Sequence, residues 1–189
     1  MSQQELFQQI IDRRRELSSL FHQYWEQYSS FHTWQFWVNV SFLLIPLVLL
    51  ALFIDRKRIF EIGFFGFAIH SISIYLDVFG IHEGYWGYPY QVTSYLASNF
   101  ALDGSLLPIS CMFMYQFTYK KGFIFYTGMI GLAILFSFIV KPLFEKMGLF
   151  YLNPTMTYPK LFLYYIGGVV IAVIITKIFH KYSRTSSVT

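Results

Sequence analysis

The chain has 189 residues, of which 56% are apolar, 22% aromatic and only 13% charged, whereas soluble domains carry roughly 25% charged residues. This composition excludes an intrinsically disordered chain, and the single cysteine, Cys111, excludes a disulfide-stapled secreted scaffold. The net charge of +4 comes mainly from cations at the ends of apolar segments, so it gives no support for nucleic-acid binding. The composition is typical of an integral membrane protein.

Residues 1–33 precede the first apolar segment and predict a peripheral amphipathic helix. Their early part is glutamine-rich rather than basic and then apolar, so it is not a secretory signal peptide. Such a helix lies flat on the membrane or packs on a partner. The apolar residues that recur at helical spacing are Leu6, Ile10, Leu17, Phe21, Tyr24 and Tyr28.

Four apolar segments are long enough to cross a hydrocarbon core about 30 Å thick, which takes roughly 20 helical residues. Charged residues lie mainly at their ends. The second segment also carries Glu61, His70 and Asp77, which need polar partners inside a helix bundle. The four segments are residues 34–54, 59–80, 122–140 and 161–178.

The window over residues 92–119 is too long for one untilted crossing, because its helix would measure about 42 Å. Asp103 is a good N-cap residue, and Pro108 is tolerated only near a helix start. We therefore predict a short interfacial or re-entrant helix over residues 92–102, followed by a short crossing over residues 104–119. One long, tilted and kinked helix is the alternative.

These segments predict an all-α, polytopic transmembrane bundle of about five crossings over residues 34–180, with a broken third element. Cations follow the first and third crossings and recur in a basic tail, residues 181–189, which places the carboxyl terminus in the cytoplasm. An odd number of crossings then places the amino terminus outside. The predicted location is the cell membrane, as a multi-pass protein.

The second segment carries a row of small or polar residues separated by three or four positions. This spacing puts them on one helix face, where small residues let a neighbouring backbone approach closely. We expect this row, which we call the polar stripe, to face protein rather than lipid. It consists of Gly63, Gly66, His70, Ser73, Asp77 and Gly80.

Buried polar side chains form the candidate site of the sequence. An ionised aspartate near the bilayer centre costs about 2.5 to 3.5 kcal/mol, so Asp77 needs a partner, a shared proton or a place near the interface. A hydrogen-bonded network that holds the helices in register is the favoured interpretation, and a proton-carrying or substrate-polarising site is the alternative. The cluster consists of His70, Asp77, Asn99, Asp103 and Gln116.

An aromatic loop over residues 81–90 follows the second segment. Its rings suit anchoring in the head-group region, which is favoured, or a flat ligand-binding surface, with Trp86, Tyr88 and Tyr115 as candidate binding residues. His82-Glu83 lacks the second histidine of a zinc-protease helix, so we expect no metal site. The histidines do not form the facing pair that would bind haem in a helix bundle, and we expect no cofactor.

Short aromatic-rich motifs recur over about residues 55–180, and they are Glu61 with Gly66, then Trp86, Tyr88 and Pro89, then Pro108, Met112, Met114, Tyr115 and Gln116, and lastly Lys141, Pro142, Phe144 and Gly148. With these motifs the chain resembles an uncharacterised family of small polytopic integral membrane proteins from Gram-positive, spore-forming bacteria. The resemblance implies a polytopic protein of unassigned activity. In the family pattern a glutamate usually stands where this chain has Lys141, which gives no role to an acidic residue there.

The sequence favours a non-enzymatic accessory, binding or partner-recognition protein. The alternative is an intramembrane enzyme, or a carrier of a small solute or lipid, that uses the cluster of His70, Asp77 and Asp103. A channel is disfavoured, because the segments have no repeated ring of charges. Membrane lipids are the expected partners, and a membrane-protein partner or a second copy of the chain is left open.

Overall fold

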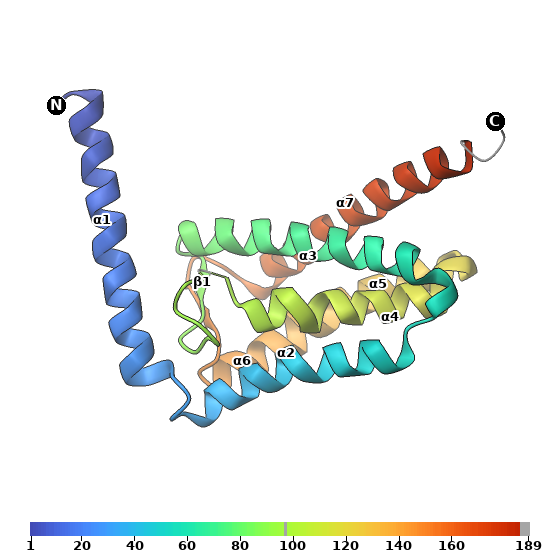
Figure 1. Cartoon of the computed structure of the whole chain (residues 1–189), viewed down its shortest axis with the longest axis horizontal. Coiled ribbons are helices and arrows are strands. Elements are labelled where there is room, and N and C mark those ends of the chain that lie inside the picture. The colour runs from blue at the N-terminus through green and yellow to red at the C-terminus, as the bar shows by residue number, and fades with distance from the viewer. Residues whose placement is uncertain (97, 186–189) are drawn as a thin grey trace.

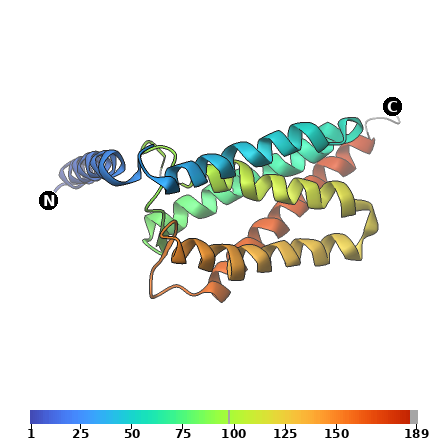
Figure 2. The same ribbon diagram turned by 90° about the horizontal axis from the view of Figure 1, so that it is seen from below.

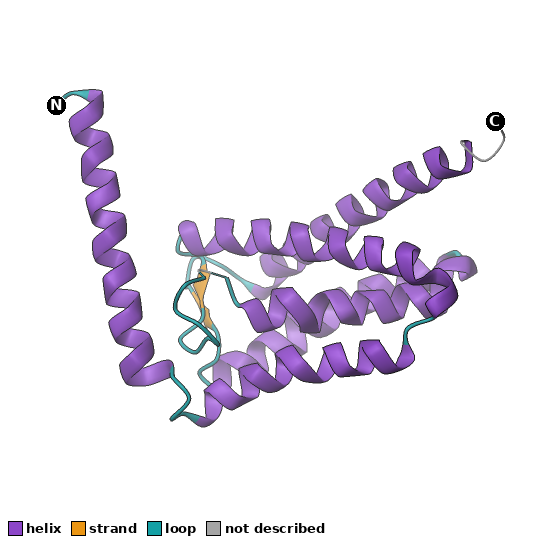
Figure 3. Cartoon of the chain, viewed as in Figure 1, coloured by secondary structure: helices purple, strands orange, loops and turns teal. Residues whose placement is uncertain are grey.

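The computed structural model describes residues 1–96 and 98–185. These residues are all-α apart from one pair of two-residue strands, and the predicted fold class is confirmed (Figure 3). The helices are α1 (Gln3–Tyr24), α2 (Trp34–Phe53), α3 (Ile59–His82), α4 (Leu107–Thr118), α5 (Phe123–Leu135), α6 (Lys141–Lys146) and α7 (Tyr158–Thr185), and the antiparallel strands are β1 (Trp86–Gly87) and β2 (Tyr151–Leu152).

The helices from α2 to α7 form a bundle in which successive crossings run in opposite directions, with α5 and α6 joined by a widened turn into one crossing (Figures 1 and 2). Helix α3 is central, since it packs against both α4 and α7, and α4 packs in turn against α5. Among the described residues, four helical stretches are long and apolar enough to cross a membrane. These stretches are Trp34–Phe53, Arg56–His82, Phe123–Lys146 and Tyr158–Tyr182.

The third element differs in detail from the prediction. Residues 92–96 are not helical, so the prediction of a short helix over residues 92–102 is wrong. The helix begins at Phe100, and the cap is Asn99 rather than Asp103, because the Asn99 side-chain oxygen accepts the Leu102 amide at 3.1 Å. From there the helix continues through a widened turn into α4, so the element is broken by a change of register rather than by a second start.

Two widened turns precede the two prolines of the inner helices. A π-helical turn over Leu102–Leu106 ends where the Leu107 amide donates to the Leu102 carbonyl, and Pro108 follows. A second one over Phe136–Val140 ends where the Lys141 amide donates to the Phe136 carbonyl, and Pro142 follows. Because proline has no N–H, each helix must leave carbonyl groups of the preceding turn free.

Helix α1 projects away from one end of the bundle (Figure 1). It begins with a capping box between Ser2 and Glu5, and none of its residues is buried. Its last turns are attached to the loop after β1 by a hydrogen bond of 2.8 Å between His22 and Ser94 and by one of 2.9 Å from Trp25 to the Gln91 carbonyl.

The tail prediction falls partly outside the described residues, because α7 runs to Thr185 and residues 186–189 are not described.

The polar stripe on α3 faces protein over most of its length. A Cβ atom on Gly66 would lie 2.3 Å from the Met112 sulfur of α4, and one on Gly80 would lie 1.9 Å from the Trp86 ring. Asp77 is buried between these positions. Gly63 is the exception, since a Cβ atom there would meet no atom within 4 Å. The inward orientation predicted for the stripe is therefore confirmed for its middle and its end near β1.

Candidate functional site

Asp77 is the centre of a buried network where α3 approaches the β1 loop. Its Oδ1 atom accepts hydrogen bonds from the Trp86 indole at 2.8 Å and from the Tyr88 hydroxyl at 2.6 Å. Its Oδ2 atom accepts the main-chain amide of Asn99 at 3.3 Å. Three donors from two chain segments therefore fix one carboxylate, which offsets much of the cost of its burial.

Two glycines bring the loop aromatics back onto α3. Gly84, with a φ of +67°, ends the helix, and the Tyr85 amide then donates to the Gly80 carbonyl at 2.8 Å. This is the pattern of a Schellman C-cap, in which glycine adopts the left-handed conformation without strain. The following strand β1 pairs with β2, and Gly80 leaves the space that the Trp86 ring occupies.

Lys141 is the cation of the site. It is only 2% exposed, its ammonium group donates to the Tyr88 oxygen at 2.9 Å, and it lies 4.0 Å from the centroid of the Phe150 ring. Burial, together with the charges of Asp77 and Asp103, raises the pKa of Tyr88 well above its usual value, so the hydroxyl keeps its proton. Tyr88 therefore links the two charges by accepting from Lys141 and donating to Asp77.

Asp103 is buried beside this linked pair, with 4% of its surface exposed. Its Oδ2 atom has no hydrogen-bond partner among the described residues. Its main-chain carbonyl accepts a hydrogen bond of 2.8 Å from His70 Nδ1, which ties the widened turn to α3. The Asp103 carboxyl group lies close to the Asp77 carboxylate, to the Lys141 ammonium group and to the Ser73 hydroxyl.

A cavity of about 60 Å³ lies against these groups, between α3, the widened turn with α4, α6 and α7. Such a volume holds a few water molecules or one small organic group. Its polar wall consists of Ser73, Asp77, Asp103 and Lys141. Its other walls are aromatic or aliphatic, and Ile72, Leu76 and Val169 are only half-buried there, so the cavity borders the outer seam between α3 and α7.

The structure brings together some of the predicted site residues. Asp77 and Asp103 line the cavity, and Asn99 lies beside them, with its side-chain amide donating to Asn39 at 3.2 Å. His70 contacts the main chain of Asp103 rather than Asp77. The predicted binding residues Trp86 and Tyr88 also line the cavity, where they act as donors to Asp77.

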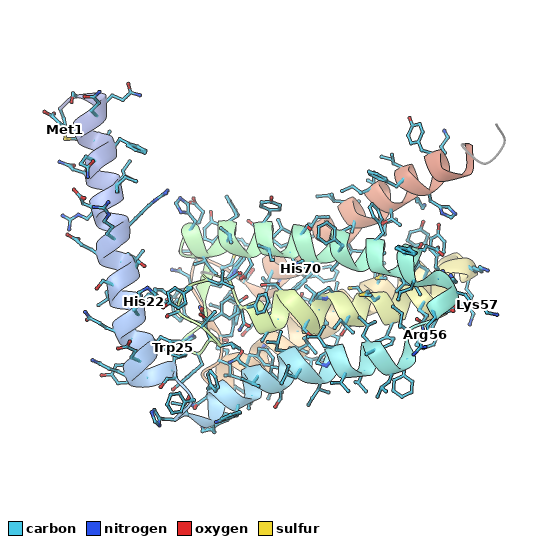
Figure 4. All side chains as sticks on the ribbon, viewed as in Figure 1. Met1, His22, Trp25, Arg56, Lys57 and His70 are labelled. Atoms are coloured by element: carbon cyan, nitrogen blue, oxygen red, sulfur yellow. The ribbon has the colours of Figure 1, made fainter. Side chains whose placement is uncertain are left out.

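Two predicted residues lie elsewhere. Gln116 accepts the Asp55 amide at 2.8 Å, at the end of the bundle that carries Arg56 and Lys57 (Figure 4). Tyr115 donates to Glu61 at 2.8 Å, near the same end. His22 and Trp25, which are hydrogen-bonded to the loop after β1, lie near the opposite end of the bundle (Figure 4). The polar group around Tyr115 and Gln116 is therefore separate from the cavity.

Lys141 was not among the residues predicted for the site. It ends an apolar segment and is followed directly by proline, so it resembles the cations that flank membrane crossings. The one signal in the sequence was its position on the apolar side of that proline. Cys111, which also lines the cavity, was noted in the sequence only as an unpaired cysteine.

The site has no metal-binding geometry, because the described part of the chain contains no group of three histidine, cysteine, aspartate or glutamate side chains that could hold an ion. Its long apolar helices make the chain a multi-span membrane protein by length and composition. No family model, no curated protein and no solved structure matches the chain.

Proposed function

We propose that the protein is a non-enzymatic membrane protein that binds a small amphiphile in the cavity beside α3 and α7. One observation carries the proposal: a cavity with an unpaired buried carboxylate oxygen of Asp103 on one wall and half-buried aliphatic side chains on another wall. A polar head group would meet the first wall. An alkyl chain would follow the second wall toward the lipid.

The chemistry of the site favours binding over catalysis. Covalent catalysis needs a nucleophile within hydrogen-bond reach of a base. Cys111 lines the cavity, but no hydrogen bond joins it to another described residue. Asp77 and Tyr88 are already engaged with each other, and Lys141 donates to Tyr88. Because these side chains are already hydrogen-bonded to one another, they support a site that holds a ligand rather than one that reacts with it.

An intramembrane enzyme or proton-coupled carrier is the second candidate, and the same Asp103 oxygen favours it, because a carboxyl oxygen without a donor can take up and release a proton. The two candidates differ in the fate of the ligand after it binds. A binding protein releases its ligand unchanged on the same side, whereas an enzyme changes it and a carrier delivers it across the membrane.

We also propose an orientation in the cell membrane, with the cavity toward the outer side and the carboxyl terminus in the cytoplasm. The cations after α2 and after α4, at the end of the bundle remote from the cavity, support this orientation. The motif resemblance supports membership of the family of small polytopic proteins from spore-forming bacteria. Membrane lipids, a membrane-protein partner or a second copy remain proposed partners.

Photolabelling of the protein in lipid nanodiscs tests the proposed binding site. Two eight-carbon probes that carry a diazirine, one an alcohol and one a primary amine, are irradiated with the protein, and the labelled residues are mapped by mass spectrometry. We expect saturable labelling by at least one probe at cavity residues such as Cys111 and Tyr165. Labelling confined to lipid-facing residues, without saturation, would refute the proposal.

Matched variants separate the cavity from the lipid-facing surface. Val169→Phe fills the cavity wall, and Val170→Phe makes the same change one residue away at a position that is 49% exposed. We expect the first variant to abolish saturable labelling and the second to retain it. Ligand release unchanged, measured by extraction and mass spectrometry of the probe, distinguishes binding from catalysis.

A further inference from the structure

We propose that the ligand of this cavity carries a primary ammonium head group. This inference rests on the proposed function, because it names the class of amphiphile that the same cavity binds. The observation behind it is a juxtaposition of two carboxylates, one lysine and an aromatic wall around a space that the chain does not fill.

The charges of the cavity do not balance. Asp77 and Asp103 bring two negative charges, and Lys141 brings one positive charge. The Lys141 charge is directed to Asp77, because the Tyr88 hydroxyl accepts from one and donates to the other at 2.9 and 2.6 Å. Asp77 also accepts hydrogen bonds from the Trp86 indole and the Asn99 main-chain amide. With both carboxylates ionised, one negative charge has no cation of its own, and Asp103 is the carboxylate that Lys141 does not serve through Tyr88.

The hydrogen-bond inventory leads to the same residue. The Asp103 Oδ2 atom lacks a donor among the described residues, although only 4% of the residue surface is exposed. A buried carboxylate oxygen is costly without a donor, and a donor that carries a positive charge compensates it best. A primary ammonium group supplies both the charge and the N–H donors. A quaternary ammonium group supplies the charge alone.

The aromatic wall favours a cation over a neutral donor such as an alcohol. Trp86, Tyr88, Tyr164 and Tyr165 line the cavity, and aromatic faces attract cations within about 6 Å of the ring centroid. The site already holds one ammonium group in this way, because Lys141 lies 4.6 Å from the Tyr88 centroid and 4.0 Å from the Phe150 centroid. A second ammonium group would meet the same kind of surface.

Competition with the photolabel tests the head-group class. Octylamine, octan-1-ol, octanoate and octyltrimethylammonium share one chain length and differ only in the head group. A charge-assisted hydrogen bond contributes about 1.5 to 3 kcal/mol, and each 1.4 kcal/mol corresponds to about a tenfold change in affinity. We therefore expect octylamine to displace the label at a concentration at least tenfold lower than that of each other compound.

Two variants locate the preference. Asp103→Asn keeps the shape of the side chain and removes its charge, and it should bring octylamine and octan-1-ol to within about threefold of each other. Glu83→Gln removes an exposed carboxylate near the same end of the bundle, and it should leave the tenfold preference intact. If Asp103→Asn does not elute as a single folded species, the head-group series on the wild-type protein decides the question.

The outcomes separate the two proposals. Equal displacement by octylamine and octan-1-ol would overturn the ammonium inference, as expected if Asp103 simply carries a proton, and would leave amphiphile binding standing. Stronger displacement by octanoate would overturn the inference in the opposite sense and assign the cavity to Lys141. A label that no compound displaces would overturn the proposed binding function itself.

Discussion

Replacement of Asp77 tests whether the buried network holds the helices and the β1 loop together. Asp77→Leu would leave three buried donors without an acceptor, namely the Trp86 indole, the Tyr88 hydroxyl and the Asn99 amide. Each unpaired donor costs about 1 to 3 kcal/mol, so the sum is about 3 to 9 kcal/mol. Native proteins have a total stability of about 5 to 15 kcal/mol, and we therefore expect a severe loss of folded protein.

Asp77→Asn provides the graded comparison. The asparagine oxygen can still accept from Trp86 and Tyr88, but its NH₂ group would face the Asn99 amide, donor against donor. Only one of the three hydrogen bonds is lost, and it is the longest, at 3.3 Å. The expected cost is about 1 to 3 kcal/mol, which leaves most of the protein folded.

The assay is size-exclusion chromatography of a fluorescent fusion in mild detergent, followed by the melting temperature of the monodisperse fraction. Glu83→Gln is the control, because it removes a carboxylate that is exposed to solvent near the same end of the bundle. A melting temperature of Asp77→Leu equal to that of the wild type would refute the structural role. Loss of amphiphile labelling in a fully stable Asp77→Asn would instead indicate that the charge serves the ligand.

Three further predictions concern the same region. Gly80→Ala should lower the melting temperature because its Cβ would lie 1.9 Å from the neighbouring indole ring, whereas Gly63→Ala, with no atom within 4 Å, should not. Lys141→Met removes a buried cation and should cost about 3 to 5 kcal/mol, and adding Asp103→Asn to it should restore part of the loss, which a double-mutant cycle of melting temperatures measures. The protonated Tyr88 hydroxyl contributes stability that is complete below pH 10.0, its pKa outside the fold, and declines as the pH rises above that value. The fall in melting temperature above pH 10.0 should therefore be less steep in Tyr88→Phe, and an equally steep fall would contradict the assignment.

The sequence predicts the architecture because hydrophobic length and the positions of small residues are local properties. Apolar segments bounded by charges define the four long crossings, and the spacing of the polar stripe defines which face of α3 meets protein. Asp77 and Asp103 could be expected at one end of the bundle, because Asp77 lies near the end of one crossing and Asp103 just before the start of the next, which runs in the opposite direction. The sequence does not indicate whether these two carboxyl groups lie close together.

The start of the third element shows where local rules become insufficient. Asn99 and Asp103 are both good N-cap residues, four positions apart, and the sequence around each is compatible with a helix start. Asn99 is selected because its side chain also donates to Asn39 on α2, while its main-chain amide donates to Asp77 on α3. Only tertiary contacts distinguish the two candidates.

Lys141 illustrates a stronger limit. Its partner Tyr88 is 53 positions away, and a lysine before a proline at the end of an apolar segment is ordinarily a flanking cation. The widened turn before Pro142 changes the rotation of the helix at that point, and the lysine lies inside the protein. In a regular helix through the same residues, the Lys141 side chain would point in a different direction.

The same irregularity explains how Asp103 reaches the cavity with a bonded main chain. In a regular α-helix the Asp103 carbonyl would accept the Leu107 amide, but that amide donates to Leu102 instead, and Pro108 offers no replacement. His70 supplies the missing donor from α3. The two ionisable residues that sequence periodicity places least well, Asp103 and Lys141, thus both occur at proline-linked widened turns, and both face the cavity. Asp77 reaches the same cavity from the regular helix α3, so the site combines one regular helix with two helices that widen before a proline.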